Sequence, residues 1–158
     1  MDTTVQIIEV KEHLLAASQG EADAQTLVKQ LFSLLDEVWK FLKVNPHLKN
    51  EGLNVFLYHD EDDKDLLHTE RGMQIEAGVI VTGSFEGTGT VVCSTTPGGM
   101  VATAVHTGPY DTLGETHSAI RKWCNANHRP KTGLYWEIYG HWTDDPNQLS
   151  TQVFYLLK

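Results

Sequence analysis

The stretch that decides the fold is a strand-like segment near the C-terminus, Leu134-Tyr135-Trp136-Glu137-Ile138-Tyr139-Gly140-His141-Trp142. Side chains alternate between the two faces of a β-strand, so this segment separates into two sets of residues. One face carries side chains that suit a core, namely Trp136, Ile138, Gly140 and Trp142. The other face carries Tyr135, Glu137, Tyr139 and His141 and therefore places a carboxylate between two tyrosines.

The carboxylate of Glu137 has two interpretations. A flat organic cation suits a face of this kind, because ion pairing adds to the attraction between a cation and aromatic rings. The alternative is a solvent-facing acid between two ordinary sheet tyrosines. The strand alone leaves both open.

Length and composition indicate one ordinary globular domain, residues 1–158, with 41% hydrophobic residues and a mean hydropathy of -0.29. No run approaches the length of a membrane span. The start, residues 1–6, lacks a basic region followed by an apolar run, so no signal peptide is expected. Cys93 and Cys124 are isolated and are typical of reduced thiols. These features predict a cytoplasmic protein.

The chain is acidic, with 12 Lys and Arg against 21 Asp and Glu and a net charge of -9. An acidic surface repels phosphate backbones, and no basic stripe compensates for it, so nucleic-acid binding is not expected. The same field mildly favours cationic partners.

Hydrophobic periodicity predicts two helices among several strands. Residues 23–44 carry an apolar stripe at helical spacing, and Asn45-Pro46 ends it. A second helix is predicted over 112–126, where Thr112 and Glu115 fit a capping box. The predicted strands are an interrupted strand at 5–17 and strands at 53–58, 73–82, 100–107, 134–142 and 151–157.

The order of elements occurs twice, and the segment 52–58 aligns without gaps on 133–139, an offset of 81 residues. This predicts an α+β fold of tandem duplicated strand-helix-strand-strand units at about 5–82 and 100–158. Both helices are expected on one face of an antiparallel sheet, with a ligand groove on the other. The offset relates Phe56 to Glu137 and Tyr58 to Tyr139, so the acid occurs in the second copy alone.

Three motifs carry a resemblance to a known family. Val105-His106-Thr107-Gly108-Pro109-Tyr110 leads into a helix that ends near Trp123, Trp136-Glu137-Ile138-Tyr139 follows, and Asp145-Pro146 precedes the last strand. The chain resembles the GyrI-like family, the effector-binding domain of AraC-type and multidrug-responsive regulators, with a SOUL-like tandem fold. The strongest match covers residues 100–158. The resemblance implies a pocket for hydrophobic, often cationic, small molecules, with Glu137 at the expected glutamate.

The resemblance and the repeat together predict the ligand-binding residues Glu137, Tyr135, Tyr139, Phe56, Tyr58, Tyr110, His106 and Trp142. The predicted function is a stand-alone binding protein for a lipophilic, in some cases cationic, ligand, because the chain starts directly in the first strand without a helix-turn-helix. A monomer or weak dimer is expected. The histidines are scattered and show no metal-binding spacing, so neither a metal nor a cofactor is expected.

Two alternatives stay open at this point. Some family members are implied to be hydrolases of strained cyclopropane compounds, and Glu137, Tyr139 and Tyr110 would fill the acid and helper roles here. The family name also implies inhibition of a topoisomerase. This second alternative is the weakest, because a charge of -9 over 158 residues is not a dense mimic of DNA.

Overall fold

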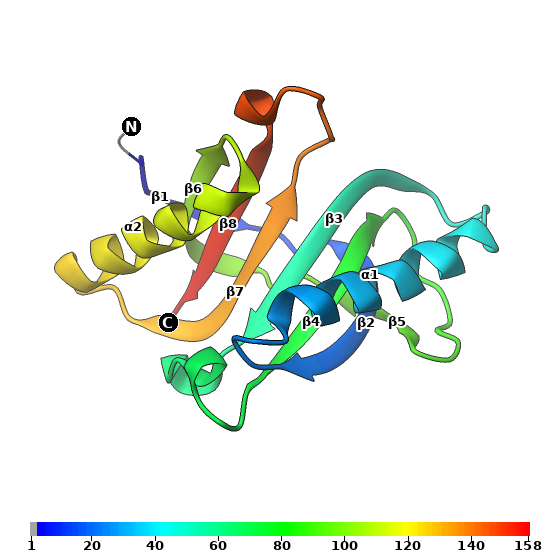
Figure 1. The fold of residues 1–158 in the computed structure, drawn as a ribbon, viewed down its shortest axis with the longest axis horizontal. Coiled ribbons are helices and arrows are strands. Elements are labelled where there is room, and N and C mark those ends of the chain that lie inside the picture. Colours follow the sequence, from blue (N-terminus) through cyan, green and yellow to red (C-terminus); the bar gives the residue numbers. More distant parts are fainter. Residues whose placement is uncertain (1–2) are drawn as a thin grey trace.

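The computed structural model describes residues 3–158; Met1 and Asp2, part of the start that lacks a signal-peptide pattern, lie outside the described residues. The chain has the predicted α+β fold, one antiparallel sheet of eight strands with two helices (Figure 1). The strands are β1 (Gln6–Val10), β2 (Leu14–Ala22), β3 (Asn50–His59), β4 (Met73–Val81), β5 (Val91–Thr95), β6 (Gly99–Thr107), β7 (Lys131–Tyr139) and β8 (Ser150–Leu157). The helices are α1 (Leu27–Lys43) and α2 (Leu113–Ala126).

The strand order β1-β6-β8-β7-β3-β4-β2-β5 places β7 and β3 at the centre of the sheet. On one side of this centre lie β3, β4 and β2, and on the other lie β7, β8 and β6 in the corresponding order. Phe56 and Glu137 are Cα partners across the central pair. The arrangement is symmetric about the centre, while the duplication of the sequence itself stays a prediction.

The sheet is strongly curved, because short connectors join strands that lie near its opposite edges. β1, one edge, continues after three residues into β2, which lies beside the other edge strand, β5. The connectors also bond to each other: the Thr96 N–H donates to His13 O at 2.9 Å, and the His13 N–H donates to the Thr96 hydroxyl at 2.9 Å. The two edges of the sheet therefore meet at these connectors.

The concave face encloses a core of its own, made by strand residues alone: Leu15, Ala17, Val55, Leu57, Val101, Trp136 and Phe154. Trp136 and Phe154 stack with ring centroids 5.1 Å apart. The predicted core role of Trp136 is thereby confirmed. These side chains pack closely and fill the middle of this face.

Both helices cover the opposite, convex face (Figure 1). α1 packs on β2 and β4, and α2 packs on β6 and β8, so the central strands β3 and β7 lie between them. The stripe of α1 is buried as predicted at Leu31, Leu34, Leu35, Val38 and Leu42. Each such side chain contributes about 1.5–3 kcal/mol through the removal of apolar surface from water. None of the described helices is long and apolar enough to cross a membrane.

Several boundaries differ from the sequence predictions. The interrupted strand at 5–17 is two separate strands in different parts of the sheet. α1 begins at Leu27 rather than at Asp23, because the Asp23 carboxylate accepts the N–H groups of Gln25 and Thr26 at 2.9 Å and holds a turn there. β7 ends at Tyr139, so His141 and Trp142 lie beyond the strand.

The capping box predicted at Thr112 and Glu115 does not form. Thr112 occupies the N-cap position of α2, but its hydroxyl makes no capping bond to the helix. It donates instead to Pro109 O at 3.0 Å and lies 3.2 Å from His106 Nε2. A 3₁₀ turn at Tyr110–Thr112 leads into the helix and takes the hydroxyl away from the first turn.

Candidate ligand-binding site

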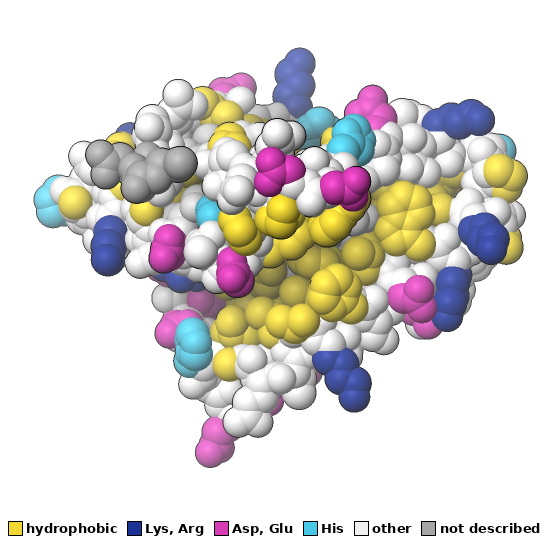
Figure 2. Space-filling model, turned by 45° about the horizontal axis from the view of Figure 1, so that its top comes forward, with side chains coloured by type: hydrophobic (Ala, Val, Ile, Leu, Met, Phe, Trp, Pro, Cys, Tyr) yellow, Lys and Arg dark blue, Asp and Glu magenta, His cyan; other side chains and the backbone are white. Residues whose placement is uncertain are grey.

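A cavity of about 770 Å³ opens between α1 and α2, above the central strands β3 and β7. Figure 2 shows it as a hollow lined by hydrophobic side chains. The lining is Leu27, Val28, Leu31, Phe32 and Leu35 from α1, Gly52, Asn54, Phe56 and Tyr58 from β3, Tyr110, Asp111 and Leu113 at the start of α2, and Tyr139, Gly140 and Trp142. The groove thus lies on the face that carries the helices. The sequence prediction places the ligand groove on the opposite face, whereas this apolar cavity lies beside the helices because α1 and the start of α2 supply part of its lining.

Aromatic rings form a continuous wall along this cavity. Phe56 and Tyr139 meet edge to face with centroids 5.2 Å apart, and Tyr110 packs on Tyr139 at 5.3 Å in the same way. Phe32 extends the wall to α1, with its centroid 6.4 Å from that of Phe56. Phe32 is 62% exposed and Trp142 is 73% exposed at the mouth. Large apolar side chains exposed around a hollow are typical of a binding surface.

Glu137 lies directly beneath this wall and is only 4% exposed. The hydroxyls of Tyr58 and Tyr139 both donate to its Oε1 atom, at 2.8 and 2.9 Å. Both tyrosines line the cavity, whereas the carboxylate lies behind their hydroxyl groups. A cavity ligand therefore faces the phenols, and the charge of Glu137 lies one hydrogen bond deeper.

The second oxygen of this carboxylate is held from α2. His117 Nε2 lies 2.6 Å from Glu137 Oε2, and His117 Nδ1 lies 2.6 Å from the Tyr155 hydroxyl. The Arg121 guanidinium, one turn later on α2, lies 5.4 Å from the centroid of Tyr155 and 5.5 Å from that of Tyr135. Three ionisable side chains thus bond directly to one buried carboxylate, an arrangement often found at functional sites.

The tyrosines of this cluster stay protonated well beyond neutral pH. Burial, followed by the negative charge of Glu137, raises the pKa of Tyr58 and Tyr139 well above the usual value. Burial also raises the pKa of Tyr135 and Tyr155, and the charge of Arg121 opposes part of this rise. Tyr58 and Tyr139 are therefore fixed as hydrogen-bond donors to the carboxylate.

The structure brings together five of the eight residues predicted to bind ligand: Phe56, Tyr58, Tyr110, Tyr139 and Trp142 line the cavity. Glu137 lies behind this lining. Tyr135 is buried away from the cavity, stacked between Tyr58 and Tyr155 with centroid distances of 4.8 Å. Trp142 reaches the cavity because the chain leaves the strand after Tyr139. Ligand binding by these residues stays a prediction.

His106 lies outside this cavity, and its ring is fully occupied by structural hydrogen bonds. Nδ1 lies 2.9 Å from the Thr116 hydroxyl, and Nε2 lies 2.9 Å from Pro109 O. A carbonyl can only accept, so Nε2 carries the hydrogen and Nδ1 accepts from Thr116. This geometry gives His106 the role of joining the end of β6 to the start of α2 rather than of contacting a ligand in the groove.

The sequence analysis gave His117 no role in the site. Leu113, His117, Ile120 and Cys124 recur at helical spacing and are all buried, so this spacing contained the signal. It also missed Val28 and Phe32, because their exposure on α1 gives them no place in a core pattern.

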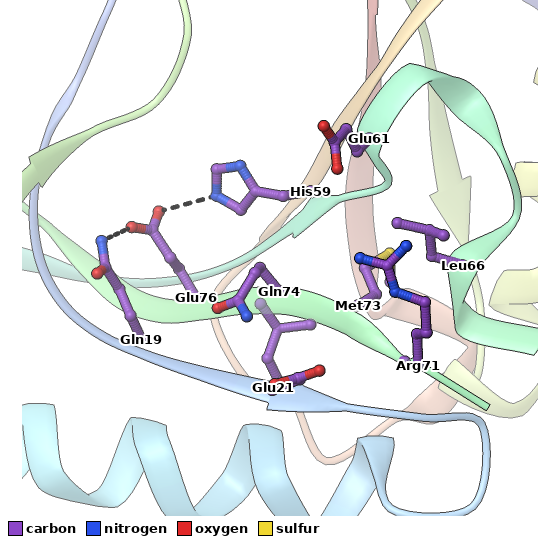
Figure 3. A pocket seen from close by; sticks show the side chains of 11 residues that line it. Gln19, Glu21, His59, Glu61, Leu66, Arg71, Met73, Gln74 and Glu76 are labelled. Atoms are coloured by element: carbon purple, nitrogen blue, oxygen red, sulfur yellow. Dashed lines mark hydrogen bonds and ion pairs between the residues drawn. The ribbon is translucent and has the colours of Figure 1, made fainter. Parts of the chain in front are cut away.

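A second, polar pocket of about 460 Å³ lies on the concave side, at the start of β4 (Figure 3). Its buried Glu76 carboxylate receives the Gln19 amide and lies 3.7 Å from His59 Nε2 (Figure 3). Burial by itself raises the pKa of Glu76, but the His59 and Gln19 contacts outweigh it and leave the pKa lowered. Glu76 is therefore charged and held by neighbouring side chains.

Comparison with known proteins agrees with this fold. The family model described as GyrI-like small molecule binding domain matches residues 3–158, and no curated protein matches. The C-terminal domain of EcmrR has 19% identity and a TM-score of 0.80, over 100% of this chain and 99% of that one. SAV2435 bound to tetraphenylphosphonium has 10% identity and a TM-score of 0.67, over 100% and 94%. A hydrolase from Listeria innocua has 16% identity and a TM-score of 0.56, over 98% and 91%.

The structural neighbours share the architecture of one antiparallel sheet with two helices. The family match extends over both strand-helix-strand-strand units, well beyond residues 100–158, where the motifs read from the sequence are strongest. The resemblance inferred from the sequence is confirmed, and the chain belongs to the GyrI-like small-molecule-binding domain family.

Proposed function

We propose that the cavity between α1 and α2 binds a lipophilic organic cation and that Glu137 supplies the attracting charge. The observation that carries this proposal is the buried carboxylate behind two cavity-lining phenols, at 2.8 and 2.9 Å. Each phenol donates its hydrogen to Glu137, and both tyrosines line the cavity. The neighbour SAV2435 is bound to tetraphenylphosphonium, a cation of this class, which supports the proposal.

The arrangement favours cations that have no hydrogen-bond donors. An ammonium group with N–H bonds gains most by touching a carboxylate directly, but here Tyr58, Tyr139 and His117 occupy Glu137. A tetra-substituted cation needs no such contact and gains from aromatic faces. The cavity, at about 770 Å³, lies in the range of small-molecule sites.

The charge of Glu137 contributes a modest, measurable share of the affinity. Two unit charges about 7 Å apart at an effective dielectric constant of about 20 interact with about 2 kcal/mol, or about thirtyfold in Kd. The remaining affinity comes from apolar and aromatic contacts, which do not distinguish a cation from a neutral molecule of the same shape.

The test is a fluorescence titration that follows Trp142 at the mouth of the cavity. Tetraphenylphosphonium and tetraphenylborate have the same shape and opposite charges, so their ratio of Kd values isolates the charge. We expect the wild type to prefer the cation and Glu137→Gln to lose about a thousandfold of that ratio, because removal of the charge weakens the cation and strengthens the anion by about thirtyfold each. Glu86→Gln, an exposed acid outside the cavity lining, is the matched control. An unchanged ratio in Glu137→Gln would refute the role of the charge.

The alternative function is hydrolysis of a strained cyclopropane-type electrophile. The contact of Glu137 with His117 and two phenols favours it, because this set resembles a general acid and base. Glu137 would accept a proton from water as the water oxygen bonds to one ring carbon. The carbon–carbon bond would break, Tyr139 would protonate the carbon that receives the electron pair, and Glu137 would return its proton to the Tyr139 oxygen, 2.9 Å away. Turnover that disappears in Glu137→Gln supports this reaction, and no turnover over a panel of cyclopropanes counts against it.

We also propose that the protein works without nucleic acid, as a cytoplasmic monomer or weak dimer. The support is its net charge of -9, which opposes contact with phosphate backbones. Mixing the protein with labelled duplex DNA at low salt tests this, since low salt strengthens any electrostatic association. A saturable shift in anisotropy would contradict it.

A further inference from the structure

We propose that His117 is the positioning residue that keeps Glu137 charged, and through it sets the preference of the groove for cations. The effect on cation preference rests on the proposed function. The ionisation of Glu137 itself does not depend on any ligand. His117 is 8% exposed, comes from α2, and touches Glu137 on the side away from the cavity. It therefore acts on a ligand through the carboxylate and not by contact.

The hydrogen bonds of the cluster specify where each proton lies. An ionised carboxylate only accepts, so Glu137 Oε1 takes the two phenol hydrogens and Oε2 takes a hydrogen from His117 Nε2. In the neutral imidazole, Nδ1 then accepts from the Tyr155 hydroxyl at 2.6 Å. Tyr155 thereby holds the tautomer that lets His117 donate to the acid.

Loss of this donor would change the charge of the site. A buried carboxylate is stable as an anion when several donors surround it, and a desolvated carboxyl with too few donors takes up a proton instead. Without His117 the Oε2 atom has no remaining hydrogen-bond partner among the described side chains. A protonated Glu137 still occupies the same space but offers no charge to a cation.

The groups that face His117 come from three elements. Glu137 and Tyr135 approach from β7, Tyr155 approaches from β8, and Arg121 lies one turn away on α2. The rings of Tyr135 and Tyr155 meet the imidazole edge to face at 5.8 and 5.6 Å. The pair Glu137–His117 is therefore enclosed by aromatic rings, where the number of hydrogen-bond donors decides the protonation state.

Two variants separate positioning from packing. His117→Gln keeps an N–H donor near the position of Nε2, and His117→Leu removes it while keeping the volume. We expect His117→Gln to retain the ratio of Kd values for tetraphenylphosphonium and neutral triphenylphosphine oxide. We expect His117→Leu to lose about tenfold of this ratio near neutral pH. The Kd of the neutral probe is expected to change little in either variant.

A ligand-free readout tests the inference even if no cation binds. Infrared spectra distinguish a protonated carboxyl from a carboxylate, so His117→Leu should show an extra carboxyl C=O band that disappears on adding Glu137→Gln. If His117→Leu does not fold, Tyr155→Phe serves instead, because it removes the donor that holds the tautomer. A carboxylate that stays ionised in these variants overturns the inference. An unchanged cation preference in the wild type and Glu137→Gln overturns the proposed function separately.

Discussion

Phe56 of β3 and Glu137 of β7 lie directly opposite each other at the centre of the sheet, as Cα partners. The two positions correspond in the 81-residue alignment of the sequence, yet one carries a neutral ring that lines the cavity and the other a buried acid. The site is therefore asymmetric on a symmetric arrangement of strands. The buried acid comes from the second half of the chain, whereas both halves supply apolar and aromatic side chains to the cavity.

Removing a single phenol hydroxyl should weaken both the fold and the cation preference. Tyr139→Phe deletes one of three donors to Glu137, which leaves a buried charge less satisfied at a cost of about 1–3 kcal/mol. Chemical denaturation and the titration with tetraphenylphosphonium measure the two effects. Tyr110→Phe is the control, because Tyr110 packs on the ring of Tyr139 without bonding to Glu137. Equal losses in the two variants would contradict this role.

Truncating the exposed aromatic residues at the mouth should affect ligand binding and spare the fold. Phe32→Ala and Trp142→Ala are each expected to weaken the ligand by about tenfold, while the free energy of unfolding changes by about 0.5 kcal/mol. Calorimetric titration is suitable for the ligand, since Trp142→Ala removes a fluorophore. Val105→Ala, at an apolar residue that is 58% exposed outside the groove, should leave both quantities unchanged.

Alkaline pH should unfold the protein sharply. The folded pKa values of Tyr58, Tyr135, Tyr139 and Tyr155 lie above the unfolded value of 10.0, so above that pH the unfolded chain binds fewer protons than the folded one. Stability then falls as pH rises, by about 1.4 kcal/mol per pH unit for each tyrosine. Phenolate absorbance and circular dichroism should change together. Ionisation of these tyrosines in a folded protein near pH 10 would contradict the prediction.

Acid pH should remove the contribution of Glu76. Its folded pKa lies below the ordinary 4.5, so its stabilisation is present above that pH and is lost as pH falls through the folded pKa. Glu76→Gln should therefore cost about 1 kcal/mol at neutral pH, and the difference from the wild type should shrink in acid. Urea unfolding at several pH values measures this. A difference that is constant down to the acid range would show that volume and not charge matters.

Adding a methyl group at Gly133 should be severely destabilising. Gly133 has a φ of +98°, a Cβ there would collide with the backbone carbonyl of Asp60, and its own carbonyl accepts the Asp60 N–H at 2.9 Å. Gly133→Ala is expected to cost about 3 kcal/mol or more. Gly83→Ala, where a Cβ meets no atom within 4 Å, should be nearly neutral. Thermal melts of the two variants make the comparison.

The features predicted correctly from the sequence are those that a local hydrophobic period encodes. Alternation along residues 134–139 separated Trp136, which lies in the concave core, from Tyr135 and Glu137, which face the helices. The helical stripe of α1 was equally clear, because burial on one face imposes a period on the sequence. The capping box at Thr112 failed because a turn outside the helix competes for the same hydroxyl.

The sequence by itself determined the elements, the α+β class and the presence of one acid among aromatic residues, since these follow from periodicity and composition within short segments. Tertiary structure alone decided the face on which the groove opens and the partners of Glu137. The curvature of the sheet comes from pairing between distant strands, and the contact between His117 and Glu137 joins a helix to a strand 20 residues away. No local period encodes such contacts, because they depend on how the packed elements meet.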